Sequence, residues 1–372
     1  MKKLLFLVCI TFRLSTSAQD LFDDVLPVIH SNNPKADYRI ENDWTRNSWG
    51  INPDVSPDVL QVYCSNTPVS FGFYTDVDSI VFPLKPGESK QFYVLTKDGK
   101  FALTEIKAIP YSPISFNTTN KKPSYSFWYE PNINNAYLRK LKNDYGLEKL
   151  VEGSTTEKEK ALKVLNWVHK QWPHNGNNEP KKSDAISILQ EAKEGKNFRC
   201  VEYGIVTTAC LNALGMPARV LGLKTKDVET TEAGAGHVLL EVYMKDYKKW
   251  VLLDGQFDIM PVLNHVPLNA VEFRHAIVNH YDDLELQSLS GTTKRRYVNW
   301  VFPYLYYFDV NFDNRQSEKL VRQQVKGKTS LMLVPQGAKE PTVFQKRFLI
   351  TYCAYTNSLA DFYAAPSFNT SN

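Results

Sequence analysis

The sequence predicts an α+β fold in which helices pack on an antiparallel sheet, with β-rich regions on both sides of this core. Residues 132–214 carry apolar side chains at helical intervals. Residues 218–254 are made of short runs rich in β-branched and aromatic residues. Helices first and strands after favour an α+β core over a doubly wound sheet. We therefore divide the chain into a β-rich domain at 19–130, a core at 131–285 and a β-rich region at 286–372.

The first 18 residues have the layout of a secretory signal peptide. Lys2 and Lys3 form the charged start, and residues 4–12 form an apolar run that is too short to span a bilayer. Small residues at 15–18 form the cleavage region. The sequence thus predicts an exported protein, periplasmic or extracellular, without stable membrane insertion after the signal at 1–18 is removed.

The composition is that of a folded protein that is nearly neutral once the signal is removed. Hydrophobic residues make up 43% of the chain, enough for large cores. The formal net charge is +4, and residues 1–18 hold three positive charges and no acid, so the rest carries +1. This charge gives no reason to expect nucleic acid or an anionic membrane as a partner.

The N-terminal domain is predicted to consist of short strands. The runs VSFGFY at 69–74 and QFYVLT at 91–96 are rich in aromatic and β-branched residues. Asp98 and Gly99 separate the second run from FALTEI at 101–106. Asp-Gly between two such runs is a hairpin signal, so we expect a hairpin at this turn.

The core is predicted to begin with helices. Thr156 has the capping-box spacing to a glutamate and begins the first helix, which Pro173 stops. Asp184 can cap a second helix that ends at Gly195. A third helix is predicted from Cys200 to the glycine at 215.

Strands are predicted after these helices. The runs at 218–223, 237–244 and 249–254 have strand composition, and a short turn joins the last two into a hairpin. In the C-terminal part, residues 271–289 are predicted to be helical. The aromatic run at 297–312 is predicted to be a strand.

A thiol, an imidazole and a carboxylate lie at the ends of these predicted elements. Cys200 opens a helix, whose free backbone N–H groups favour the thiolate that attacks a carbonyl. His237 follows the small residues at 233–236, which leave space around a reactive sulfur. Asp254 ends the neighbouring strand and can accept a hydrogen bond from one ring nitrogen. These are the roles of nucleophile, base and orienting group.

Other interpretations of the cysteines and carboxylates are open. Asp258 can replace Asp254, although it lies beyond the predicted strand end. Cys64 and Cys353 lie in strand-like runs and are the candidate disulfide, whereas Cys210 has the character of a small core residue. The histidines show no metal-ligand spacing and no phosphate-binding glycine loop is present, so no metal or cofactor is predicted.

Taken together, the motifs of this stretch carry a family resemblance. Residues 155–262 resemble the transglutaminase-like superfamily of papain-like cysteine enzymes. The resemblance rests on motifs that occur in order: Cys200 with residues 201–204, Leu214-Gly215-Met216-Pro217-Ala218-Arg219, Gly236-His237-Val238 with Glu241 and Val242, and Trp250 with Asp254.

The resemblance implies acyl transfer from an amide through a thioester. Cys200 would be the nucleophile, His237 the general base and acid, and Asp254 the orienting residue. The implied partner is a peptide or protein substrate. Water as the acceptor would make the protein a protease or amidase, and an amine would make it a transferase.

The resemblance also implies donors for the oxyanion. The backbone N–H of Cys200 would supply one, and Gln171, Trp172 and His174 are the candidates for a side-chain donor. The sequence departs from the family pattern at Arg199, where a small residue is common, which leaves the shape of the cleft open.

Function is predicted as an exported thiol enzyme that cleaves or transfers peptide and amide bonds. The alternatives are a protein-glutamine transglutaminase and a catalytically idle binding or scaffold protein on the same fold. We expect Glu202 and Arg219 to pair with each other, because charges buried near a site are usually paired.

Overall fold

The computed structural model describes residues 26–65, 67–119, 122–316 and 321–367. The predicted signal peptide at 1–18 lies outside these ranges. The described chain divides into two compact units, the first ending at Tyr111 and the second beginning at Ser112. This division falls before residue 130, where the β-rich N-terminal domain is predicted to end.

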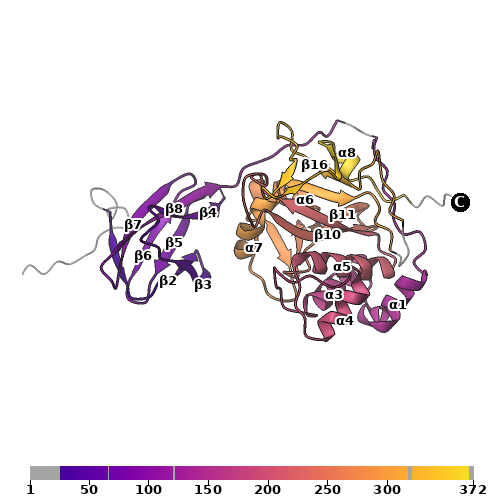
Figure 1. Cartoon of the computed structure of the whole chain (residues 1–372), viewed down its shortest axis with the longest axis horizontal. Helices are drawn as coiled ribbons and strands as arrows, with labels where there is room; N and C mark the ends of the chain where they lie inside the picture. Colours follow the sequence, from indigo (N-terminus) through magenta and orange to yellow (C-terminus); the bar gives the residue numbers. More distant parts are fainter. Residues whose placement is uncertain (1–25, 66, 120–121, 317–320, 368–372) are drawn as a thin grey trace, which may run out of the picture. The chain divides into compact units, whose positions relative to one another are not determined.

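The N-terminal unit is a β-sandwich (Figure 1). One sheet has the order β1-β7-β8-β4, with strands Val28–Ser31, Ser89–Thr96, Phe101–Pro110 and Asp58–Cys64. The other has the order β3-β2-β5-β6, with strands Asp43–Gly50, Lys35–Ile40, Val69–Tyr74 and Ser79–Leu84.

Alternating aromatic side chains fill the space between these sheets. Phe73 of β5 meets Phe92 of β7 with ring centroids 5.2 Å apart, and both side chains are fully buried. The predicted hairpin is confirmed: β7 and β8 pair from Leu95 opposite Phe101, and Gly99 takes a φ of +80° in the turn. That left-handed backbone is the one glycine adopts readily.

The C-terminal unit is built on a mixed sheet of order β11-β10-β9-β15-β16-β19 (Figure 1). Its strands are Lys249–Leu253, Gly236–Met244, Ala218–Lys224, Tyr307–Asn311, Ser330–Leu333 and Cys353–Thr356. Neighbours pair antiparallel except β16 and β19, which are parallel. Smaller sheets comprise β13-β12-β14, at Val266–Pro267, Met260–Leu263 and Leu284–Gln287, and β17-β18, at Val343–Phe344 and Phe348–Leu349.

Helices pack against this sheet and confirm the α+β prediction. They are α1 Ala136–Asp144, α2 Leu147–Leu150, α3 Glu157–His169, α4 Ala185–Lys193, α5 Cys200–Ala213, α6 Ala270–Asn279, α7 Lys294–Val301 with the 3₁₀ turn η2 Phe302–Tyr304, and α8 Leu359–Phe362. The predicted caps are present: Thr156 and Asp184 accept from the first turns of α3 and α4.

Helix α5 lies directly on the sheet. Its apolar residues share one core with those of α3, α4, β10 and β11. Gly204 permits this approach, because a Cβ there would lie 3.1 Å from the carbonyl oxygen of Leu239 and from Val238. The close packing holds the beginning of α5 beside the beginning of β10.

The C-terminal part differs from its prediction in two ways. Residues 294–304 form α7 and η2, so only Tyr307–Asn311 of the aromatic run is a strand. The buried residues of α7 are Tyr297, Val298 and Val301, which follow helical spacing. This helical period of the buried side chains outweighs the β-propensity of the aromatic residues. The run at 271–289 is likewise split into helix α6 and strand β14.

Part of the region at 286–372 extends the sheet of the core. Strands β15, β16 and β19 continue the sheet beyond β9. In the described structure Cys64 and Cys353 are not joined by a disulfide. The two cysteines belong to different units, and the Cys64 thiol lies 3.8 Å from the carbonyl oxygen of Ile109 in its own unit. Within the described ranges, no helix combines the length and apolar character needed to cross a bilayer.

Candidate active site

The structure brings the three predicted side chains together. Cys200 is the first residue of α5, His237 the second of β10, and Asp254 follows β11 directly. Nε2 of His237 donates to Oδ2 of Asp254 at 2.8 Å. The Cys200 sulfur lies close enough to the imidazole to raise its pKa. Because Nε2 bonds the carboxylate, Nδ1 is the nitrogen left for the sulfur.

The Asp254 carboxylate is fixed by four donors. Oδ1 accepts from the backbone N–H groups of Gln256 at 3.0 Å and Phe257 at 3.3 Å. Oδ2 accepts from the Tyr297 hydroxyl at 2.8 Å as well as from His237. The carboxylate is fully buried, so these donors replace the water that an anion needs.

These contacts favour a charged His237. Burial disfavours the imidazolium, but the Asp254 carboxylate and the Cys200 sulfur outweigh burial and raise the pKa of His237 to about 9. His174 behaves in the opposite way: burial and the neighbouring His237 charge lower its pKa. The site therefore contains one imidazole that holds its proton at neutral pH and one that does not.

Arg199, the unusual residue before the thiol, is held by carboxylates. Its side chain bonds both carboxylate oxygens of Glu202, and its backbone N–H donates to Glu202 at 3.0 Å. It also pairs with Glu179. The expected pair of Glu202 with Arg219 is therefore wrong, because a partner three residues away in the first helical turn takes Glu202.

Two of the three candidate side-chain donors for an oxyanion, Gln171 and Trp172, differ in their availability. Nε2 of Gln171 donates to the backbone oxygen of Trp167 at 2.7 Å. The Trp172 indole N–H is buried and has no hydrogen-bond partner among the described residues. The Trp172 ring lies 4.6 Å from the ring of Tyr203 and 5.7 Å from that of Phe198, so it packs against residues on both sides of Cys200.

Asp258 lies in a different network from Asp254. Its Oδ2 accepts from Asn166 and Ser290, each at 2.8 Å, and from the Leu289 backbone at 3.0 Å. These contacts join α3 to the loop at 288–290. Asp254 is the carboxylate that His237 bonds.

The sequence interpretation missed the aromatic residues that α7 and η2 bring to this site. Trp300 meets the His237 ring edge-on, with centroids 4.7 Å apart. Tyr304 lies 6.0 Å from the same ring, and burial together with the Cys200 charge raises the pKa of its hydroxyl. With Tyr297, these residues recur at helical spacing in the sequence, a signal that the prediction of a strand concealed.

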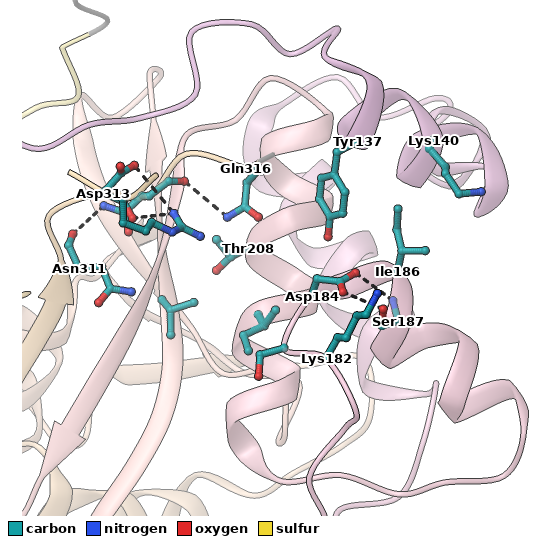
Figure 2. A pocket seen from close by; sticks show the side chains of 15 residues that line it. Tyr137, Lys140, Lys182, Asp184, Ile186, Ser187, Thr208, Asn311, Asp313 and Gln316 are labelled. Carbon is teal, nitrogen blue, oxygen red and sulfur yellow. Dashed lines mark hydrogen bonds and ion pairs between the residues drawn. The ribbon is translucent and has the colours of Figure 1, made fainter. Parts of the chain in front are cut away.

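A separate cavity of about 630 Å³ opens between α1, α4, α5 and the segment after β15 (Figure 2). Its polar walls are largely engaged: Asp184 caps α4, and Asp313 pairs with Arg315. None of the three predicted catalytic residues lines it. Among the described residues, no group of three His, Cys, Asp or Glu is arranged to hold a metal ion. The expected absence of a cofactor stays a prediction.

An α+β core with a thiol at a helix start and a His–Asp pair on the adjoining hairpin has the architecture of the predicted class. The sequence profile of the transglutaminase-like superfamily matches residues 147–255. Residues 147–255 are therefore a transglutaminase-like superfamily domain, and members of this superfamily are usually cysteine enzymes. A comparison with curated proteins gives no match.

Several solved structures are similar to this chain. A candidate cysteine protease from Cytophaga hutchinsonii is 15% identical, with a TM-score of 0.27 over 42% of this chain and 54% of that one. The periplasmic domain of TgpA from Pseudomonas aeruginosa is 15% identical, with a TM-score of 0.26 over 34% and 47%. Red sea bream transglutaminase is 10% identical, with a TM-score of 0.24 over 63% and 50%. The chain thus spans about half of each of these structures.

Proposed function

We propose that this protein is a thiol enzyme that cleaves or transfers peptide and amide bonds, with Cys200 as nucleophile, His237 as acid and base, and Asp254 as orienting residue. The observation that carries the proposal is the position of His237 between a sulfur and a buried carboxylate. A buried imidazole with an orienting carboxylate on one nitrogen and a nucleophile on the other is the arrangement of acyl-transfer catalysis.

The chemistry follows from where the protons reside. In the resting ion pair the Cys200 proton is already on His237, and the thiolate attacks the amide carbon, forming a C–S bond. His237 then donates its proton to the leaving nitrogen, the C–N bond breaks, and a thioester remains. Water or an amine next attacks the thioester while His237 removes its proton. The sulfur leaves as a thiolate beside the imidazolium that has formed, so the enzyme returns to its first state.

The proposed setting is outside the cytoplasm, and the proposed substrate is a peptide or protein. The signal-like residues 1–18 support export, and the near-neutral charge of the remaining chain supports the exclusion of nucleic acid. The nature of the acceptor, water or amine, separates the hydrolase from the transglutaminase alternative.

The first test measures how fast a haloacetamide alkylates Cys200 at different pH values, with mass spectrometry as the readout. The pKa of a free cysteine thiol is about 8.5, so only about 1% of it is thiolate at pH 6.5. The His237 pKa of about 9 means that the imidazolium needed for an ion pair persists up to that pH. We expect fast alkylation at pH 6.5 and a roughly hundredfold loss there in His237→Ala.

His275→Ala serves as the matched control, because this imidazole lies on the exposed side of α6. It should leave the alkylation profile unchanged. Amide turnover, which needs the imidazolium as an acid, should fall as pH rises through about 9. Slow alkylation at pH 6.5 in the unmodified protein would remove the basis of the proposal.

A second test concerns the oxyanion. Trp172→Phe keeps an aromatic ring but removes an indole N–H that has no partner among the described residues. If this N–H binds the oxyanion, kcat should fall by about 10²-fold while KM changes little. Gln171→Leu is the comparison, because the amide of Gln171 already bonds Trp167. Equal effects of both substitutions would rule out the role assigned to Trp172.

A further inference from the structure

The segment α7–η2, residues 294–304, lies beyond the part of the chain that matches the family. We propose that Tyr297 of this segment is a positioning residue, whose hydroxyl fixes the Asp254 carboxylate against His237. This inference rests on the proposed function and adds a residue to it.

Tyr297 and His237 both donate a hydrogen bond to the same carboxylate oxygen of Asp254. The Tyr297 hydroxyl and Nε2 of His237 each lie 2.8 Å from Oδ2 of Asp254. Tyr297 and Asp254 are fully buried, and His237 is 2% exposed. A hydrogen bond to a buried carboxylate is strong, because no water competes for the same oxygen.

The Tyr297 ring is held in place independently of this bond. It stacks on Phe273 at 6.2 Å and lies 5.2 Å from Phe257 and 6.4 Å from Trp300, measured between ring centroids. Packing on three sides leaves the hydroxyl one direction, toward Asp254. The hydroxyl is thus a fixed donor, which a positioning role requires.

Loss of this donor has two consequences for the imidazole. Oδ2 of Asp254 would keep only His237, so the carboxylate becomes a more basic acceptor and holds the imidazolium more firmly. The carboxylate plane also becomes less firmly fixed, because the backbone donors hold only Oδ1 and His237 becomes the single donor to Oδ2. A more basic imidazole is a poorer acid toward a leaving nitrogen, so turnover slows even though the thiolate persists.

Other titratable groups face this pair and stay in place when Tyr297 is changed. Burial and the Asp254 charge raise the pKa of Tyr203, on α5. Cys200 begins the same helix, His174 lies in the segment after α3, and Tyr304 belongs to η2. Each is present in the unmodified and the substituted protein, so a change in titration reports on the Tyr297 hydroxyl.

The test compares Tyr297→Phe with Tyr137→Phe in the full chain. Tyr137 is also a buried tyrosine of this unit, but its hydroxyl accepts from the Ala185 backbone at 3.0 Å, away from the site. The readouts are the pKa of His237, from NMR titration of its ring, and the separate values of kcat and KM. Tyr297→Phe should raise the His237 pKa by about half a unit or more and lower kcat by roughly three- to tenfold, with KM nearly constant.

A variant that keeps the hydroxyl guards against a loss of folding in Tyr297→Phe. Tyr297→3-fluorotyrosine makes the phenol a stronger donor, so the His237 pKa should move in the opposite direction. Unchanged titration in both variants would overturn the inference, as would equal effects of Tyr137→Phe. Because the titration needs no substrate, it also separates this inference from the proposed function, which fails if Cys200 alkylates slowly at pH 6.5.

Discussion

Cys200→Ser should abolish amide-bond turnover, with a loss of at least about 10³-fold. Serine keeps the shape of the side chain, but its hydroxyl does not form the anion that the start of α5 and the His237 imidazolium stabilise in a thiol. The folded protein should remain, because Cys200 is only partly buried and lies outside the shared core. Turnover of a peptide library, with product masses as the readout, measures the loss.

Cys210→Ala is the matched control for this substitution. Cys210 lies on the same helix, but it is fully buried among apolar residues, and burial raises the pKa of its thiol. It should keep turnover and lose only some stability, since a small group leaves the core. A labelled primary amine in the same assay identifies the acceptor: incorporation into a glutamine-containing protein indicates transfer, and release of acid indicates hydrolysis. Turnover that survives in Cys200→Ser would exclude Cys200 as the nucleophile.

The positions of the three central residues were predictable because local signals and topology agree. A helix start at Cys200, a strand after small residues at His237 and a hairpin ending at Asp254 are each readable from short stretches. The hairpin register then fixes where His237 and Asp254 lie relative to each other, because Leu240 of β10 pairs with Leu253 of β11. The neighbouring strand ends therefore bring the imidazole to the carboxylate.

The aromatic neighbours of the site were not predictable in the same way. Tyr297, Trp300 and Tyr304 approach His237 and Asp254 from more than forty residues away in sequence. No local rule specifies such long-range packing, and the aromatic composition favoured a strand. Likewise, the sequence indicated that Glu202 needs a cationic partner. It did not indicate that this partner is Arg199 and not Arg219.

Arg219 pairs with Glu241. The two side chains are fully buried, with Nη2 of Arg219 2.7 Å from Oε2 of Glu241. Another guanidinium nitrogen donates to the Phe362 carbonyl at 2.9 Å, and the Trp250 ring lies 4.2 Å from the guanidinium carbon. The pair thus joins β9 and β10 to the C-terminal helix α8.

Glu241→Gln should therefore destabilise the C-terminal unit by about 3–5 kcal/mol, because it leaves the Arg219 charge buried without its counterion. In a thermal scan of the full chain, we expect the transition of this unit to fall by roughly 10 °C. The exposed pair Lys140–Asp144 on α1 is the control, and Asp144→Asn should change stability by less than about 1 kcal/mol. The double variant Arg219→Met with Glu241→Leu removes both charges, and it should recover much of the loss. If Glu241→Gln has no larger effect than Asp144→Asn, the pair does not hold the C-terminal segment on the sheet.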